Sequence, residues 1–435
     1  MNYVMEIVFT IKNNMNLSGE IREALDLMEK SNKHFFITGK AGTGKSTLVK
    51  EFKKKTSKNI AVLAPTGVAA VNVGGQTIHS FFGFKPGVNP DNVQKTYRRK
   101  KLYKSLDAIV IDEVSMVRAD LLDSIGRFLQ LNGPKDGLFG GVQVIMIGDL
   151  YQLPPVLPNH EKDFYQMRYE SPYFFASKQF KKIDPTFVKL RRVHRQSNSD
   201  FISILNRVRS GDIRADDLKR LNENVQNKFN FDEDGVFLTT TNRKADKINS
   251  TQLKRLDGRE YKFNGSIKGS FPKSHLPTGK ELVLKEGARI MLLNNDSEGR
   301  WINGDVGKVL EVEKTGDPII RVKLDEGRVV KVTENKWERI KFSYDKKEDK
   351  IESQEAGSFH QLPVRLSWAV TIHKSQGKTF KKAMIDFQRG TFSHGQAYVA
   401  LSRCTGLDGL SLRRPIRSSD IIVDNRVSKF LEKIE

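Results

Sequence analysis

The sequence predicts an α/β protein with two domains built on parallel sheets, the second of which carries a small inserted β-barrel. Apolar runs such as IAVLAP, DAIVID and VQVIMIG alternate with helical patterns from about residue 17 to 184, as strands covered by helices on both faces do. A second alternating region starts near Phe187 and resumes near Leu362. Between them, from about Asp257 to Phe359, short strands joined by Gly, Asp and Asn turns indicate the barrel.

The composition indicates a globular chain with a polyanionic partner. Its 435 residues suggest about three domains, and 38% hydrophobic with 29% charged residues is ordinary for a soluble protein. The net charge of +22 favours nucleic acid as partner, with an anionic membrane second and mere solubility as the third reading. The single cysteine, Cys404, excludes an internal disulfide and suits a reducing compartment.

The apolar segments predict neither secretion nor a membrane span. The amino-terminal run MNYVMEIVFTIKNNM is interrupted by Glu6 and lacks a small-residue cleavage site. No segment approaches the roughly 20 apolar residues that a span requires. With no nuclear or mitochondrial targeting extension in view, we expect a cytoplasmic protein, nucleoid-associated in a prokaryotic cell.

The segment GKAGTGKS, Gly39 to Ser46, matches G-x-x-x-x-G-K-[ST] between a predicted strand and a predicted helix. Backbone N–H groups of such a loop wrap phosphates, and the helix amino terminus adds a favourable dipole. We expect Lys45 to reach the β- and γ-phosphates of ATP and Ser46 to bind Mg²⁺. The expected nucleotide-binding residues of this loop are Gly39, Ala41, Gly42, Thr43, Gly44, Lys45, Ser46 and Thr47.

Two acids end the next predicted core strand, IVIDE. Asp112 would hold Mg²⁺ through water, and Glu113 would activate the attacking water. A strand that ends in two acids is often only a solvated edge. Downstream of a phosphate-binding loop, the pair predicts a hydrolytic site.

A third core strand continues into an unusual exit, VQVIMIGDLYQLPPV, Val142 to Val156. The two prolines force an extended path, so Gln152 is held in one direction. Its amide can bond both the γ-phosphate and the attacking water, which predicts a γ-phosphate sensor. A polar helix cap is the simpler alternative.

Hydrolysis also needs positive charge against the transition state. Arg195 in VHRQ and Arg403 in YVALSR are the candidates. The second α/β region has no phosphate-binding loop of its own, so it would supply these arginines across the interdomain cleft. An ordinary surface ion pair is the alternative for each.

The ordered motifs resemble the PIF-one family of 5′-to-3′ DNA helicases, RecD-like members of helicase superfamily one B. They run FITGKAGTGKS, APTGVAAVNVGGQTIHSFF, IVIDEVSM, LFGGVQVIMIGDLYQLPPV, LRRVHRQ, LTTTNRKADKIN, WAVTIHKSQGKTF and GQAYVALSR, and span roughly residues 17–412. The resemblance implies two RecA-like motor domains, an SH3-like inserted barrel and a short wedge. The implied limits are 1–186 with a wedge at about 84–101, then 187–256 with 360–435, and 257–359 for the insert.

The resemblance also implies site residues. Gln376 and Gly377 would lie near the nucleotide. Six residues would contact the DNA strand: Thr66, Gly67, His79, His373, Lys374 and Ser375. The family usually places a glutamine that reads adenine in the pattern Leu-Ser-x-Glu-Gln, whereas this chain has LSGEI with Ile21 there. Selectivity for adenine by that device is therefore in doubt.

The implied activity is unwinding of duplex or structured DNA, G-quadruplexes included, in replication, repair or recombination. The implied partners are ATP with Mg²⁺ and single-stranded DNA at junctions, and the implied state is a monomer that can dimerise on DNA. Two other classes stay open. One is a nucleic-acid-binding protein with a vestigial ATPase, and the other is a clamp-loader or metabolic kinase. DNA-stimulated ATP hydrolysis distinguishes the three.

Overall fold

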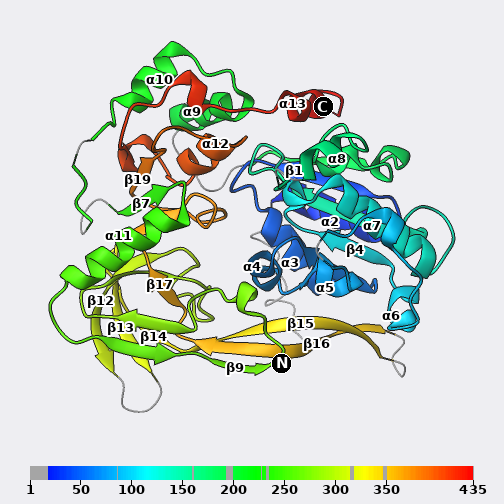
Figure 1. Ribbon diagram of the computed structural model, residues 1–435, viewed down its shortest axis with the longest axis horizontal. Coiled ribbons are helices and arrows are strands. Elements are labelled where there is room, and N and C mark those ends of the chain that lie inside the picture. The colour runs from blue at the N-terminus through cyan, green and yellow to red at the C-terminus, as the bar shows by residue number, and fades with distance from the viewer. Residues whose placement is uncertain are drawn as a thin grey trace, which may run out of the picture.

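The structure, a computed structural model, describes residues 18–85, 87–158, 161–192, 199–226, 228–231, 235–313, 318–345 and 350–434. In Figure 1 the first α/β domain lies on the right, the second at upper left, and the insert along the bottom. The predicted α/β class with parallel sheets is confirmed.

The first domain is built on a six-stranded parallel sheet in the order β3-β2-β4-β5-β1-β6. Its central strands β1, β4 and β5 are buried along their whole length, which explains their near-continuous apolar sequences. Because β6 pairs with β1, the sheet extends to Leu190, and the expected boundary at 186 falls inside a strand. The strands are β1 (Phe35–Gly39), β2 (Ile60–Ala64), β3 (Gln76–Thr77), β4 (Ala108–Ile111), β5 (Gln143–Gly148) and β6 (Thr186–Leu190).

Helices cover this sheet. The first begins where the Ser18 hydroxyl accepts a hydrogen bond from the Ile21 amide at 3.4 Å, and its apolar side packs in one cluster with Leu48 and Phe52. The helices are α2 (Gly19–Lys30), α3 (Lys45–Lys55), α4 (Gly67–Asn72), α5 (Ile78–Phe82), α6 (Lys100–Lys104), α7 (Ala119–Asn132) and α8 (Lys162–Gln166).

The expected wedge at about 84–101 contains a short 3₁₀ turn, Pro90–Asn92, which packs against α7. The Thr96 amide donates to the Asn132 side-chain oxygen at 2.8 Å. Tyr97 is 82% exposed. The segment is therefore anchored to α7 while it presents an aromatic ring to solvent.

The second domain is built on a four-stranded parallel sheet in the order β18-β7-β19-β20. Its strands come from both sides of the insert. The elements are α9 (Ser199–Ser210), α10 (Ala215–Asn222), β7 (Val236–Thr239), α11 (Asn242–Arg255), β18 (Ala369–Thr371), β19 (Ala383–Asp386), α12 (Gln396–Leu401) and β20 (Leu410–Leu412).

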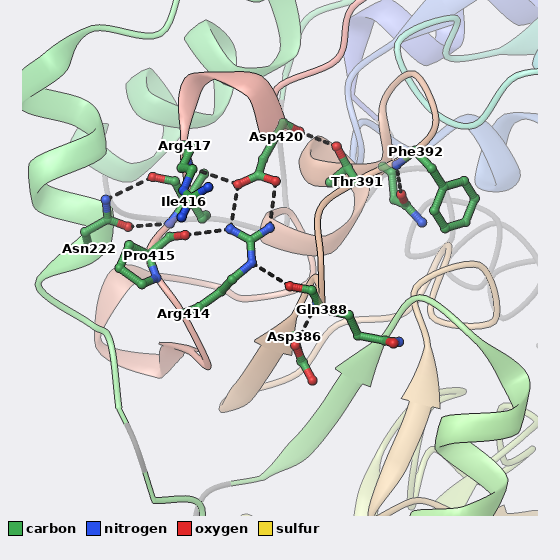
Figure 2. Close-up of polar contacts among 11 residues, drawn as sticks. Asn222, Asp386, Gln388, Thr391, Phe392, Arg414, Pro415, Ile416, Arg417 and Asp420 are labelled. Atoms are coloured by element: carbon green, nitrogen blue, oxygen red, sulfur yellow. Dashed lines mark hydrogen bonds and ion pairs between the residues drawn. The ribbon is translucent and has the colours of Figure 1, made fainter.

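An ion pair fastens the segments around β19 and β20 (Figure 2). Arg414 meets both carboxylate oxygens of Asp420 at 2.7 and 2.8 Å and donates to the Gln388 carbonyl at 2.8 Å. The Thr391 hydroxyl donates to the Asp420 carbonyl at 2.7 Å. These contacts fix the loop that leads into α12, the helix that precedes Arg403.

The insert consists of antiparallel strands divided among three sheets, in the orders β14-β13-β12-β11-β17, β15-β16-β9 and β10-β8. The SH3-like closure is therefore not confirmed, and the insert's last strand ends at Leu366, beyond the expected limit at 359. The strands are β8 (Tyr261–Asn264), β9 (Ser266–Gly269), β10 (Glu281–Leu284), β11 (Arg289–Leu292), β12 (Val306–Glu313), β13 (Ile319–Leu324), β14 (Val329–Thr333), β15 (Asn335–Asp345), β16 (Lys350–Gln361) and β17 (Val364–Leu366).

The hairpin of β15 and β16, which we call the arm, crosses to the first domain (Figure 1). Arg339 donates to the Ser80 hydroxyl at 2.9 Å, and the Phe342 ring lies edge-on to Phe81 at 5.9 Å. Farther along, the Ile351 amide donates to the Asn59 side chain at 3.0 Å. The arm thus joins the insert to the first domain, which carries the phosphate-binding loop.

The last helix, α13 (Asn425–Glu432), also returns to the first domain. The Phe430 ring stacks on Phe175 at 4.3 Å and lies 6.1 Å from Phe36 of β1. This helix, which falls in the range 360–435 expected for the second domain, therefore packs against the first. The sequence of this helix shows an apolar side, but it does not indicate the domain against which that side packs.

Candidate active site

The phosphate-binding loop lies between β1 and α3, as the motif predicts. Gly42 and Gly44 adopt φ of 82° and 89°, a left-handed backbone that a side chain would strain. The Lys45 ammonium donates to the carbonyls of Gly39 at 2.7 Å and Lys40 at 3.0 Å. Burial lowers the pKa of Lys45, while the carboxylates of Asp149, Glu113 and Asp112 oppose that shift.

The loop lines a pocket of about 660 Å³ between the domains. One wall comes from the first domain, including Glu113 and Gln152, and another from the second domain through Gly377, Thr379 and Arg403. The expected nucleotide residues that line it are Ala41, Gly42, Thr43, Gly44, Lys45, Ser46, Thr47 and Gly377. This volume and lining suit a nucleoside triphosphate.

Asp112 and Glu113 follow β4, and Glu113 lines this pocket. Asp112 is 6% exposed, and burial raises its pKa. Burial, with Asp112 beside it, raises the pKa of Glu113 to about 7. Glu113 also holds a left-handed backbone at φ 52°, rare for a residue with a side chain. A carboxylate whose pKa lies near neutral pH and whose backbone is strained is suited to accept a proton from water.

The residues present fit a magnesium ion. Mg²⁺ takes one or two protein ligands together with phosphate oxygens. The described residues contain no cluster of three or more His, Cys, Asp or Glu side chains placed to hold a metal. The carboxylates of Asp149, Glu113 and Asp112 interact electrostatically with Lys45, and oxygen ligands such as these suit a divalent cation. Asp112 directly follows β4, and Ser46 lines the nucleotide pocket.

Gln152 lies at the interface between the two domains. Its side chain donates to Asp149 at 3.3 Å and accepts from the Gln376 amide at 2.9 Å. The same Gln376 amide lies 3.4 Å from the Glu113 carboxylate. One amide from the second domain therefore touches both the expected sensor and the expected base.

Arg403 is fully buried and lines the pocket from the second domain. Its guanidinium donates to the carbonyls of Val399 at 2.7 Å, Lys378 at 3.0 Å and Ser375 at 3.2 Å. These bonds hold the guanidinium of Arg403 at the second-domain wall of the pocket. Arg195, the other expected finger, lies outside the described residues.

The expected strand-contact residues divide by exposure. Thr66, His373 and Lys374 are exposed. Ser375 is fully buried and its hydroxyl donates to the Ile372 carbonyl at 2.8 Å, so in this conformation its side chain holds a loop instead of meeting DNA.

The remaining two lie near the insert. His79 is half-buried on α5. Gly67 packs directly under His275 of the insert, since a Cβ on Gly67 would lie 2.3 Å from that ring. The insert therefore covers part of the first-domain surface where strand contacts are expected.

Three interdomain contacts were not predicted. Arg209 of α9 pairs with Asp149 at 3.1 Å. Its guanidinium also lies 4.1 Å from the centre of the Tyr151 ring. The Tyr398 hydroxyl accepts from the Ala41 amide of the phosphate-binding loop at 3.2 Å. No local pattern marks these residues, because each is defined by a partner far along the chain.

The loop between β11 and β12 also contributes to the pocket, which the sequence did not predict. Ile302, Asn303 and Asp305 reach the nucleotide pocket, and Lys378 of the second domain donates to Asn303 at 2.5 Å. Ile21, which replaces the expected glutamine, lines the same pocket.

Within the described ranges, no helix combines the length and the apolarity needed to cross a membrane.

Comparison with known proteins points in the same direction as this geometry. Residues 16–219 match the model of the PIF1-like helicase family. The chain is 34% identical to an ATP-dependent DNA helicase Pif1 of Bdellovibrio bacteriovorus, over 97% of this chain and 93% of that protein. It is also 34% identical to the human ATP-dependent DNA helicase PIF1, over 86% of this chain but only 57% of that protein.

Solved structures agree. The fold matches an unliganded Pif1 from Bacteroides sp with a TM-score of 0.89 at 37% identity, covering 96% of this chain and 97% of that one. The Bacteroides protein in complex with ADP-AlF4 gives 0.90 at 36% identity, and the form bound to single-stranded DNA gives 0.68 at 36% identity, each over 97% of both chains. With its phosphate-binding loop, acid pair and cross-cleft glutamines in place, the chain belongs to the PIF1-like helicase family.

Proposed function

We propose that this protein hydrolyses ATP with Mg²⁺ in the interdomain cleft and uses it to move 5′-to-3′ along single-stranded DNA. As a member of a family whose relatives are named ATP-dependent DNA helicases, the chain is an ATP-driven DNA helicase that acts on single-stranded DNA. We propose that it unwinds duplexes and G-quadruplexes during replication, repair or recombination.

The observation that carries this proposal is the contact of Gln376 with both Gln152 and Glu113. A γ-phosphate placed between these side chains would exchange one set of hydrogen bonds for another. Loss of that phosphate would reverse the exchange. The arrangement thus supports a two-state cleft biased by the nucleotide.

The proposed roles follow from position. Lys45 neutralises the β- and γ-phosphates, and Glu113 takes the proton of the attacking water. Arg403 and Arg195 stabilise the developing charge. Ser46 and Asp112 hold Mg²⁺, which supplies charge neutralisation on the phosphate oxygens when bound.

The proposed DNA path joins residues on both domains. Thr66 and His79 would contact the strand from the first domain, and His373 and Lys374 from the second. The net charge of +22 supports a path of backbone contacts. Because these groups lie on different domains, closing and opening of the cleft would change their spacing along the strand.

The arm supports a DNA-free arrangement for this conformation. The chain matches the unliganded relative at a TM-score of 0.89 and the DNA-bound form at 0.68, although identity and coverage are almost the same. The arm and His275 cover first-domain residues beside the expected path. We propose that DNA displaces them.

We further propose a monomer in the cytoplasm, associated with the nucleoid, that can pair on DNA. One relative's structure is described as unwinding forked DNA by two coordinating helicases.

Strand separation on matched duplexes tests the proposal. A 5′ single-stranded tail should support ATP-dependent unwinding, and an identical duplex with a 3′ tail should not. Unwinding only from 3′ tails would overturn the direction. Absence of DNA-stimulated ATP hydrolysis would overturn the motor itself.

A further inference from the structure

The nucleotide pocket has two ends of different chemistry. Its phosphate end is defined by the loop around Lys45 and by Glu113, Gln152 and Arg403. The remaining lining must face the sugar and base of a bound nucleotide. Besides Gly377 and Thr379 of the second domain, it includes Ser18, Ile21, Ile302, Asn303 and Asp305.

Ile21 forms the first-domain side of this end. It is 4% exposed, and its Cδ1 lies close to the start of α3, where a Cβ on Gly44 would approach it to 2.9 Å. An isoleucine can neither donate nor accept a hydrogen bond. The position at which an amide could distinguish adenine is therefore apolar in this chain.

Ile302 lines the same pocket from the insert. The residue is 61% exposed, although large aliphatic groups gain free energy when covered. Its loop is held in place: the Ile302 amide donates to Asp305 at 2.9 Å, and Lys378 fixes Asn303. A flat base inserted beside Ile302 would cover this surface.

Three polar side chains at this end each accept one hydrogen bond from within the protein. The Ser18 hydroxyl accepts from the Ile21 amide, Asn303 accepts from Lys378, and Asp305 accepts from Ile302. The two large side chains at this end, Ile21 and Ile302, are hydrocarbon.

We propose that Ile21, from the first domain, and Ile302, from the insert, both contact the nucleobase through hydrocarbon, a contact that we call the grip, so that this motor hydrolyses purine and pyrimidine nucleoside triphosphates alike. The inference rests on the proposed function, which makes the pocket a site of nucleotide hydrolysis. The binding free energy from apolar contact depends on the area of the base that is buried. Discrimination between bases instead needs hydrogen-bond donors and acceptors that match one base.

The grip also joins three parts of the molecule. Ile21 belongs to the first domain, Ile302 to the insert, and the insert loop is bonded to Lys378 of the second domain. Any base held between the two isoleucines would therefore help close the cleft. Closure would depend on the presence of a base more than on its identity.

The first test compares hydrolysis of ATP, GTP, CTP and UTP with a saturating oligothymidylate. The wild-type kcat/KM values should lie within about tenfold of one another. A preference for ATP of more than about 100-fold over the other three would overturn the grip and leave the motor intact. Hydrolysis of none of the four would overturn the proposed function instead.

The second test uses variants. Ile21→Gln should raise selectivity for ATP by about tenfold or more, since an amide can then bond adenine. Ile302→Ser should raise KM for all four nucleotides by about five- to tenfold while the inhibition constant of inorganic tripolyphosphate, which lacks a base, stays unchanged.

The control is Leu310→Ser, which removes an aliphatic side chain of similar size that is 45% exposed on β12 of the same insert. It should leave every KM unchanged. An unaltered KM in Ile302→Ser, or a rise confined to one nucleotide, would overturn the proposal.

Discussion

The side-chain amide of Gln376, from the second motor domain, donates a hydrogen bond of 2.9 Å to Gln152 of the first. This bond and the 3.4 Å contact of the same amide with Glu113 are polar links across the pocket at the place where a γ-phosphate is expected. Gln152 also donates to Asp149, which is paired with Arg209 of the second domain. A change at the phosphate can therefore reach α9 through two buried contacts.

Gln152→Ala should uncouple hydrolysis from unwinding. DNA binding should stay nearly intact, since Gln152 is only 6% exposed and lies in the nucleotide pocket. We would measure ATP consumed per base pair opened on a duplex with a 5′ tail. Gln166→Ala, at an exposed position, is the control. Unwinding undiminished in Gln152→Ala would remove the sensor role.

Lys45→Ala and Glu113→Gln should fail at different steps. Loss of the ammonium should weaken nucleotide binding. Glu113→Gln keeps the shape and should bind ATP, but its hydrolysis rate should fall by about 10²–10⁴-fold because the base is lost. Nucleotide binding and single-turnover hydrolysis separate the two effects. Normal turnover in Glu113→Gln would exclude it as the base.

Arg339→Gln should loosen the arm and raise the affinity for single-stranded DNA. Arg339 bonds Ser80 of the first domain and Ser270 of the insert. A net hydrogen bond is worth about 0.5–1.5 kcal/mol, or about two- to tenfold in an equilibrium constant. Arg321→Gln, exposed on β13 of the same insert, is the charge-matched control. Weaker binding in Arg339→Gln alone would mean that this arginine contacts DNA itself.

DNA binding should depend steeply on salt. With a net charge of +22, backbone contacts should dominate, and log K should fall by about 0.7 per unit log salt for each phosphate neutralised on single strands. Titration at increasing salt gives the slope. Affinity that does not change between dilute and physiological salt would contradict this expectation.

The cluster YRRKK should contribute to that slope without sequence preference. Replacing Arg98, Arg99 and Lys100 with Ala should weaken binding to mixed and homopolymeric strands alike and lower the salt slope. An unchanged affinity for DNA would show that the cluster is a solvated loop that does not contact DNA.

Local patterns predicted the parts of the site that lie on one strand end or one loop. The turn at Gly42 and Gly44, the acids after β4 and the exit at Gln152 each carry their chemistry in neighbouring residues. The apolar runs likewise predicted parallel strands, because a strand buried on both faces needs no polar positions.

The rest depends on contacts between distant segments. Tyr398 meets Ala41 across 357 positions, and Ile302 enters the pocket from an insert that composition marks only as β-rich. The pairing of β6 with β1 was missed because its sequence alternates like a strand of either domain. Such partners follow from packing, which periodicity does not encode.

The return of α13 to the first domain has a mechanical consequence. The chain leaves that domain after β6 and comes back to it at Phe430, so everything between is a closed span fixed at both ends to one body. The two attachments lie together, because the Phe430 ring is 6.5 Å from Phe187 of β6. The span therefore leaves and re-enters the first domain at one place, so the second motor domain is tethered to the same edge of the first sheet at both of its ends.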